Sequence, residues 1–332
     1  MSLFELTRQL IEIPSLTGDE GDVGAFLATY LEDAGYRVEG QKIAPTRFNV
    51  LATTDEPPRV VLSTHMDTVP PFIPWSEDDE YIHGRGACDA KGIIAAQIFA
   101  AERLRAGGVK DIGLLFTVDE ELSSEGAKAA NNHPLARECR YMINGEPTDN
   151  RMAIGTKGSI RLFITTSGRA GHSAYPEHGE SAIEKMLDIL QDLRAADWPE
   201  DSFFGATTAN IGVLEGGTRP NVIPDHARAQ LQIRLGIDIE QVKRIVERAV
   251  GGRGEMEYAS AHNPVRLFSV PGFEETVVRF TTDVPYLSNW GKPLLLGPGS
   301  ILDAHTDHER VSKRELQRAV DLYVELVNKL QS

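Results

Sequence analysis

The chain has 332 residues, of which 41% are apolar, and its formal net charge is −15. This length predicts two domains, and the apolar content is sufficient to fill their cores. The acidic balance argues against a nucleic-acid partner, whose phosphates need Lys and Arg. No stretch reaches the roughly 18 consecutive apolar residues of a membrane span.

The N-terminus and the cysteines bear on the cellular compartment. Polar residues interrupt every apolar group of residues 1–15, so we expect no signal peptide. The two cysteines, Cys88 and Cys139, fit a reducing compartment better than a disulfide framework. These features predict a cytoplasmic protein.

Helices and strands alternate through the first 157 residues. Apolar residues at helical spacing predict helices over 2–13, 20–34 and 90–108. Apolar runs rich in β-branched residues predict strands over 36–42, 48–53, 60–63, 112–118 and 140–144. This alternation is typical of a layered α/β sheet.

A different order begins at about residue 158. Strands are predicted over 159–167, 206–214, 226–235 and 254–260. Helices are predicted over 181–195 and 239–250. The resulting βαββαβ order is ferredoxin-like, so we interpret 158–263 as an inserted domain. A strand over 292–297 and a helix over 312–330 resume the α/β pattern, so 1–157 and 264–332 should form one discontinuous domain.

Acidic residues and a histidine gather where predicted strands end and in one glycine-rich turn. They are His65, Asp67, Asp89, Glu120, Glu121 and Glu146. In open α/β sheets, ligands bind at the carboxyl ends of the strands, so these side chains should converge. Carboxylates crowded at one edge would repel one another unless a cation neutralised them. The cluster therefore predicts a metal site.

The residue types indicate the metal and the division of roles. Imidazole together with carboxylate suits zinc or a neighbouring first-row ion. Asp67, two residues after His65, can hold the imidazole from behind. On an extended segment, Glu120 and Glu121 point to opposite sides and can take different roles. Two zinc ions would balance three ligating carboxylates and a bridging hydroxide, which leaves a further carboxylate free to move protons.

Seven motifs, taken in order, resemble those of one enzyme family. They are HMD at 65–67, GRGACDAKG at 84–92, DEE at 119–121, NGEP at 144–147, GRAGHSAYP at 168–176, RPNVIP at 219–224 and GPGSILDAHTDHE at 297–309. The resemblance is to the di-zinc metallohydrolases that include acetylornithine deacetylase, succinyl-diaminopimelate desuccinylase, aminoacylase and glutamate carboxypeptidase. It implies a zinc-exopeptidase-like α/β/α catalytic domain with an inserted ferredoxin-like lid and dimerisation domain.

The resemblance also implies a role for individual residues. Two zinc ions, with cobalt as a possible substitute, would have five protein ligands, namely His65, Asp89, Glu121, Glu146 and His305. Asp89 would bridge the two ions and precede a cis peptide bond. Asp67 would orient His65. Glu120 would be the general base.

Four further residues match positions that contact substrate in this family. They are His172, Asn221, Arg234 and Gly299. Asn221 and Arg234 would hold the substrate carboxylate, which a guanidinium group pairs with bidentately. Gly299 would let the backbone approach the substrate closely. In dimeric relatives the histidine that matches His172 reaches the neighbouring active site, so the resemblance implies a homodimer formed through the inserted domain.

The predicted reaction is hydrolysis of the amide bond of an N-acyl amino acid. The motif at 297–309 most resembles acetylornithine deacetylase, an enzyme of amino-acid biosynthesis. A metallo-carboxypeptidase or dipeptidase that acts on short peptides is the alternative within the family. A catalytically silent binding or scaffold protein on the same fold is the alternative of another class, but every ligand position holds the expected residue type. A cysteine hydrolase built on Cys88 is disfavoured, because nearby carboxylates would raise the pKa of the thiol.

Overall fold

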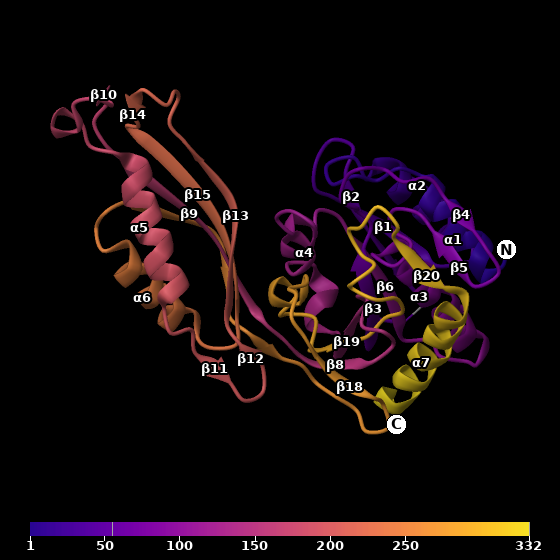
Figure 1. Ribbon diagram of the computed structural model, residues 1–332. Coiled ribbons are helices and arrows are strands. Elements are labelled where there is room, and N and C mark those ends of the chain that lie inside the picture. The colour runs from indigo at the N-terminus through magenta and orange to yellow at the C-terminus, as the bar shows by residue number, and fades with distance from the viewer. Residues whose placement is uncertain (55, 332) are drawn as a thin grey trace. The chain divides into compact units, whose positions relative to one another are not determined.

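The computed structural model describes residues 1–54 and 56–331, and the chain divides into two compact units (Figure 1). The first unit consists of Met1–Ile154, Leu267–Thr276 and Thr282–Ser332, and the second of Gly155–Arg266 and Val277–Thr281. The expected inserted range of 158–263 lies inside the second unit. Val277–Thr281 also belongs to that unit, although nothing in the sequence pointed to this segment.

A mixed sheet forms the centre of the first unit, and seven of its strands follow the order β1-β2-β6-β3-β7-β19-β8. In that order the strands span Arg37–Lys42, Phe48–Thr53, Ile112–Thr117, Val60–His65, Tyr141–Asn144, Lys292–Leu295 and Met152–Thr156. β6, β3, β7 and β19 run parallel to one another. β1, β2 and β8 pair with their neighbours in antiparallel fashion. The four parallel strands therefore end at the same edge of the sheet.

Helices cover both faces of this sheet. α1 (Leu3–Glu12), α3 (Lys91–Ala106) and α7 (Lys313–Gln331) pack together on one face, and α4 (Glu125–Ala130) lies on the other (Figure 1). α2 (Gly21–Asp33) packs against β1 and β2. Every residue of β3 and β6 is buried, as expected for parallel strands covered on both sides. The α/β class predicted from the sequence is confirmed. Among the helices of the described ranges, none is both long and apolar enough to cross a membrane.

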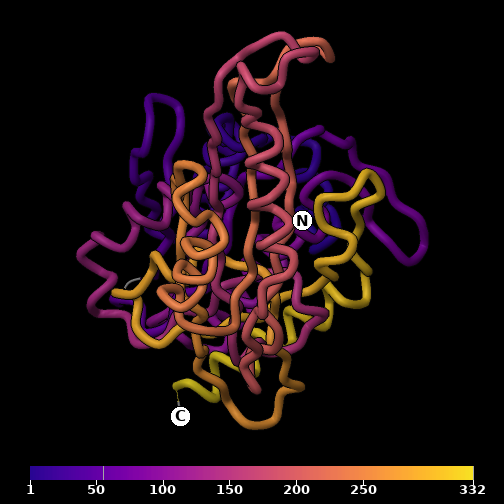
Figure 2. The backbone as a smooth tube through the Cα atoms, turned by 60° about the vertical axis from the view of Figure 1, so that its left-hand side comes forward, coloured from indigo at the N-terminus to yellow at the C-terminus, as the bar shows by residue number. Residues whose placement is uncertain are grey.

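The second unit has an antiparallel sheet with the order β13-β15-β9-β16. These strands span Thr208–Gly216, His226–Leu235, Gly158–Ser167 and Glu255–His262. Helices α5 (Ala182–Ala195) and α6 (Ile239–Val250) lie side by side against it (Figure 2). Alternate residues of β15 are buried in the core that the sheet shares with these helices.

The structure contains short elements that were not predicted from the sequence. They are β4 (Ser76–Glu77), β5 (Tyr81–His83), β10 (Gly171–His172), β11 (Glu200–Asp201), β12 (Gly205–Ala206), β14 (Val222–Ile223), β17 (Val265–Arg266), β18 (Glu275–Val278), β20 (Arg310–Ser312) and the 3-10 turns Pro134–Arg137, Pro176–His178 and Val284–Tyr286. Segments of two to four residues are too short to show a hydrophobic period. β8 and α4 were also missed, although each is somewhat longer.

Candidate active site

The ends of the parallel strands bring the predicted side chains together in the first unit. His65 is the last residue of β3, the turn with Glu120 and Glu121 follows β6, and Glu146 follows β7. Ligand atoms of His65, Asp89 and Glu121 all lie within 4.8 Å of one another. A cluster of imidazole and carboxylate groups therefore occupies the edge at which these strands end.

His305 joins the cluster from near the other end of the chain. Its Nε2 atom lies 2.8 Å from Oε1 of Glu121 and 3.3 Å from Oδ2 of Asp89. On the opposite side of Asp89, Nε2 of His65 lies 2.9 Å from Oδ1. The two oxygens of Asp89 thus face different histidines, an arrangement suited to a carboxylate shared by two ions. The peptide bond between Asp89 and Ala90 is cis, as the family resemblance implied.

Asp67 does more than orient an imidazole. Nδ1 of His65 lies 2.9 Å from the backbone oxygen of Asp67 and 3.5 Å from its Oδ1. The carboxylate of Asp67 accepts hydrogen bonds from the backbone N–H groups of Glu120 (3.0 Å) and Glu121 (3.1 Å). The backbone oxygen of Asp67 therefore makes the shorter contact to the imidazole, while its carboxylate holds the turn that carries the two glutamates.

Glu120 and Glu121 lie in a turn and not on the extended segment that the sequence analysis assumed. The turn follows Asp119, whose φ of 72° is left-handed, and this geometry separates the two glutamates. Glu121 contacts His305. Burial raises the pKa of Glu120 well above its usual value, and the negative charge of Glu146 raises it further. Different surroundings for the two acids were expected, but the turn and not strand alternation produces them.

Glu146 provides a test of whether a metal fits the cluster. Its side chain is buried, and within the described ranges its Oε1 atom has no hydrogen-bond partner. Burial raises the pKa of Glu146 well above its usual value, and Asp89 and Glu121 add to the rise although His65 opposes it. A buried carboxylate oxygen without a hydrogen-bond partner destabilises the folded chain, and a cation beside it would offset this loss of stability. The mixed imidazole and carboxylate donors fit zinc or a neighbouring first-row ion.

Protons on two imidazoles offset the acidic charge. Hydrogen bonds to Asp89 and Glu121 raise the pKa of His305 to about 10. Burial lowers the pKa of His65, but hydrogen bonds with Asp67 and Asp89 outweigh it and raise that pKa well above the usual value. Metal binding would displace these protons, because imidazole binds metals in its neutral form.

A buried ion pair that the sequence analysis missed holds the backbone at Asp89. Oε1 of Glu309 accepts hydrogen bonds from the N–H groups of Cys88 and Asp89, each at 3.2 Å. Its Oε2 lies 2.6 Å from Nη1 of Arg85, and both side chains of this pair are buried. Glu309 is the last residue of the final motif, four positions after His305, so the sequence contained a usable signal.

Asp283 is a second residue that the sequence analysis missed. Its buried carboxyl group accepts a hydrogen bond from Oγ1 of Thr117 (2.8 Å) and is also hydrogen-bonded to Ser124. These two residues flank the turn that carries Glu120. Burial raises the pKa of Asp283 to about 6. Asp283 therefore anchors both ends of this turn, and no motif marked it in the sequence.

The four predicted substrate contacts fall into two groups. Gly299 lies in the first unit, with a φ of 84°, and a Cβ atom there would be 2.5 Å from Cβ of Cys88. Glycine is therefore required at this position. His172, Asn221 and Arg234 lie in the second unit.

The second unit separates Arg234 from His172 and Asn221. β10, which ends at His172, pairs with β14, which follows Asn221, and the Ser173 N–H donates to the Asn221 oxygen at 3.1 Å. Arg234 is near the far end of β15, about 26 Å from its first residue at roughly 3.3 Å per residue. One carboxylate cannot meet both Asn221 and Arg234 of the same chain. The expectation that the two hold it together therefore requires that they come from two copies of the chain.

Comparisons with known proteins show the family to which the chain belongs. Residues 61–329 match the peptidase family M20/M25/M40. A peptidase M20 domain-containing protein of Schizosaccharomyces pombe is 40% identical over 98% of this chain and 84% of its own length. A probable carboxypeptidase of Aspergillus niger is 37% identical over 96% of this chain and 88% of its own. The crystal structure of a tripeptidase from Staphylococcus aureus has a similar fold, with a TM-score of 0.80 and 21% identity over 97% of this chain and 96% of that one.

The match to this peptidase family makes the chain a hydrolase that acts on peptide C–N bonds. The chain belongs to the peptidase family M20/M25/M40. The family resemblance that the seven motifs indicated is confirmed.

We expect Glu309→Gln to weaken metal binding by about 10–100-fold, the usual effect of losing a group that orients a ligand. Glutamine retains an acceptor for the Cys88 and Asp89 N–H groups but leaves the buried Arg85 without a carboxylate. Competition with a chromogenic chelator measures the affinity for zinc. The control is Glu12→Gln, which changes an exposed glutamate that pairs with Arg8. Equal zinc affinity in both variants would contradict the role of Glu309.

Proposed function

We propose that this chain is a di-metal amide hydrolase that removes one residue or acyl group from a short peptide or N-acyl amino acid. The observation that carries the proposal is the placement of His65 and His305 on the two oxygens of Asp89, at 2.9 and 3.3 Å. Membership of the peptidase family supports the reaction class.

Two zinc ions, with cobalt as a substitute, are the proposed cofactors. Asp89 would be shared by both ions. His305 and Glu121 would complete one site, and His65 and Glu146 the other. When bound, such ions polarise the scissile carbonyl group and make a water molecule nucleophilic at neutral pH.

Glu120 is the proposed general base. It would take a proton from the attacking water and then pass this proton to the departing amine nitrogen. Asp67 holds the N–H of Glu120, and Asp283 holds the residues that flank the turn. These contacts keep the carboxylate in position without using it as a ligand.

Glu120→Gln should lower kcat by about 10²–10⁴-fold, the usual contribution of general acid–base catalysis, and leave the metal content unchanged. Hydrolysis assays and elemental analysis of the purified protein measure the two effects. Glu121→Gln is the matched comparison and should lose metal as well as activity. Loss of metal in Glu120→Gln would show that the roles are exchanged. An unaltered chain with neither metal nor turnover would favour the binding or scaffold protein.

Two substrate classes compete within this proposal. The Aspergillus niger relative is named a probable carboxypeptidase, and the Staphylococcus aureus structure is a tripeptidase. These names favour an exopeptidase that frees one amino acid from a short peptide. The resemblance of residues 297–309 to acetylornithine deacetylase favours removal of an acyl group instead. We give the exopeptidase precedence, because the relatives match nearly the whole chain.

A substrate panel separates the two classes. It contains dipeptides, tripeptides, N-acetylornithine, N-acetylcitrulline and N-succinyl-diaminopimelate, each assayed with zinc and with cobalt. We expect the highest kcat/KM on a peptide, with release of a free amino acid detected by chromatography. A higher kcat/KM on an N-acyl amino acid would establish the deacylase, and no hydrolysis of any member would refute both.

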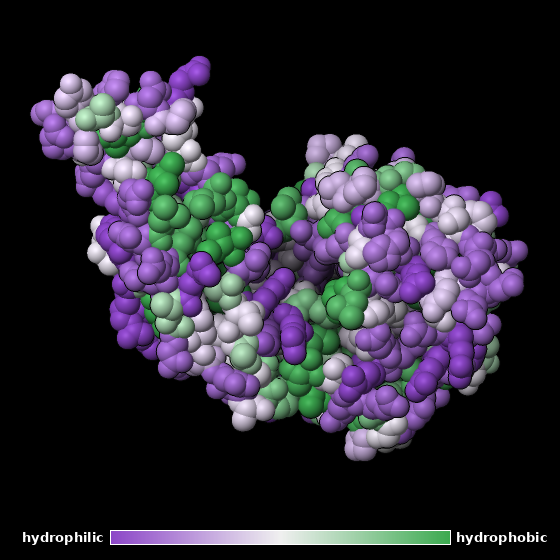
Figure 3. Space-filling view, in the orientation of Figure 1, coloured by the Kyte–Doolittle hydropathy of each residue, from purple (hydrophilic) through white to green (hydrophobic). Residues whose placement is uncertain are grey.

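A homodimer formed through the second unit completes the proposal. The length of β15 separates Arg234 from His172 and Asn221. We therefore assign Arg234 to the active site of its own copy, and His172 and Asn221 to the active site of the neighbouring copy. β13 pairs only with β15 among the described strands, and Leu214 on it is half exposed. Figure 3 shows apolar residues gathered over β13 and β15. An open strand edge with apolar side chains favours pairing with another strand, here that of a second copy.

Mixing two inactive variants tests this assignment. His172→Ala retains Glu120, and Glu120→Gln retains His172. If His172 acts on the neighbouring copy, a mixed dimer contains one complete site, and activity returns when the variants are unfolded and refolded together. No return of activity, or a strictly monomeric yet fully active chain by light scattering, would contradict the dimer.

The cysteines support a reducing compartment, and the cytoplasm remains the proposed location. Cys88 and Cys139 are both free and buried. Burial raises the pKa of both thiols, to about 12 for Cys139, so they stay protonated and unreactive.

A further inference from the structure

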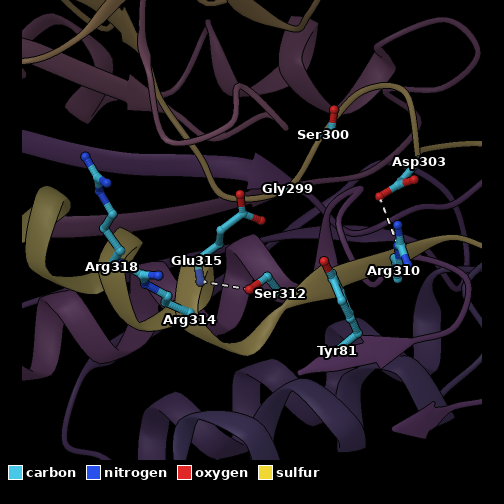
Figure 4. Close-up of a pocket in the computed structure, with 9 residues that line it drawn as sticks. All are labelled: Tyr81, Gly299, Ser300, Asp303, Arg310, Ser312, Arg314, Glu315 and Arg318. Carbon is cyan, nitrogen blue, oxygen red and sulfur yellow. Dashed lines mark hydrogen bonds and ion pairs between the residues drawn. The ribbon is translucent and has the colours of Figure 1, made fainter. Parts of the chain in front are cut away.

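A cavity of about 490 Å³ lies in the first unit, beside the loop that leads to His305. The start of α7, the strand β20 and the residues Gly299 to Asp303 surround it (Figure 4). Its size is within the range of small-molecule sites. None of the predicted metal ligands lines it, so it is distinct from the metal cluster.

Positive charge gathers in this cavity although the chain as a whole carries −15. Arg310, Arg314 and Arg318 line it, together with the acids Asp303 and Glu315. Nε of Arg310 lies 3.4 Å from Oδ2 of Asp303, so these two groups offset each other.

The second acid does not neutralise the remaining arginines. The Glu315 carboxylate points toward Gly299 and is hydrogen-bonded to its backbone (Figure 4). Burial raises the pKa of Glu315, and the charge of Asp149 raises it further. Within residues 1–54 and 56–331, no ion pair involves either arginine. Two guanidinium groups therefore remain available at the cavity.

We propose that this cavity binds a small oxyanion, a carboxylate or a phosphate, through Arg314 and Arg318. These residues are four positions apart on α7, so their side chains lie on the same face of the helix. Guanidinium groups match the geometry of carboxylate and phosphate oxygens and pair with them bidentately. The first turn of α7 also lines the cavity, and the helix dipole favours an anion there.

The position of the cavity would allow a bound anion to affect the active site. Gly299 and Asp303 belong both to its wall and to the loop that ends at His305. An anion near Arg310 competes with Asp303 for that guanidinium group, and the loop would respond. We therefore expect the bound anion to change turnover as well as stability.

Thermal unfolding of the full chain tests the binding. The probes are sodium succinate and sodium phosphate, compared with sodium chloride at equal ionic strength. We expect at least one probe to raise Tm by about 2 °C or more at saturation, and the double variant R314Q/R318Q to lose this rise. A rise with succinate alone identifies a carboxylate site, and a rise with phosphate alone a phosphate site.

The double variant R244Q/R248Q is the matched control. Arg244 and Arg248 are also exposed and four residues apart on a helix, α6, but they lie outside the cavity. The control should keep the rise in Tm. No rise in the unaltered chain, or the same response in both double variants, would overturn the proposal.

The catalytic readout is separate from the binding readout. The effective anion should change kcat/KM by about fivefold or more in the unaltered chain and in the control, but not in R314Q/R318Q. An unchanged kcat/KM in all three would overturn the connection to the His305 loop. Because Tm needs no turnover, failure of the cavity proposal remains distinguishable from failure of the proposed hydrolase function.

Discussion

The crowding of carboxyl groups at one edge of a sheet is the constraint on which the first unit depends. Asp89 and Glu146 are buried, and burial opposes the ionisation of both, while the charge of Asp89 adds to this effect at Glu146. Hydrogen bonds from His65 and His305 nevertheless lower the pKa of Asp89. These carboxyl groups can therefore lie together only if protons on imidazole or metal ions neutralise them, and the proposed chemistry depends on this neutralisation.

Groups outside the ligand set hold the cluster together. Asp67 accepts hydrogen bonds from the N–H groups of Glu120 and Glu121. Asp283 binds the residues on either side of the turn that carries these two glutamates, and Glu309 holds the backbone at Asp89. Arg85 neutralises Glu309 in turn. Because none of these bonds involves a metal, the chain itself supplies much of the order that a catalytic site requires, and a metal ion would meet donors already near their places.

The geometry of the second unit limits which of its side chains can contact the same substrate molecule. Its long strand β15 separates Arg234 from His172 and Asn221 by a distance greater than a small substrate spans. A site that uses all three must draw them from more than one chain. The charged cavity beside the His305 loop adds a separate place at which small anions could influence the enzyme.

Long elements and the ligand types could be predicted from the sequence. The helix expected over 239–250 is observed as Ile239–Val250. Apolar residues at helical spacing over twelve positions indicate which face of a helix is buried, so this helix could be predicted. His65, Asp89 and Glu121 were predicted to converge, because parallel strands present their carboxyl ends at a common edge. By itself the sequence thus determined the family and the layered fold, and it named side chains that the fold brings close together.

Only the tertiary structure decided which groups meet. The anchoring of a turn by Asp283 and the distance between Asn221 and Arg234 had no signature in the chain. Arg85 and Glu309 both lie in motifs, but nothing in the motifs showed that the two pair. The physical reason is that an acidic side chain has the same local pattern whether it binds a metal, a backbone N–H or water. Its partner is set by strand order, strand length and burial, which arise only when distant segments pack together.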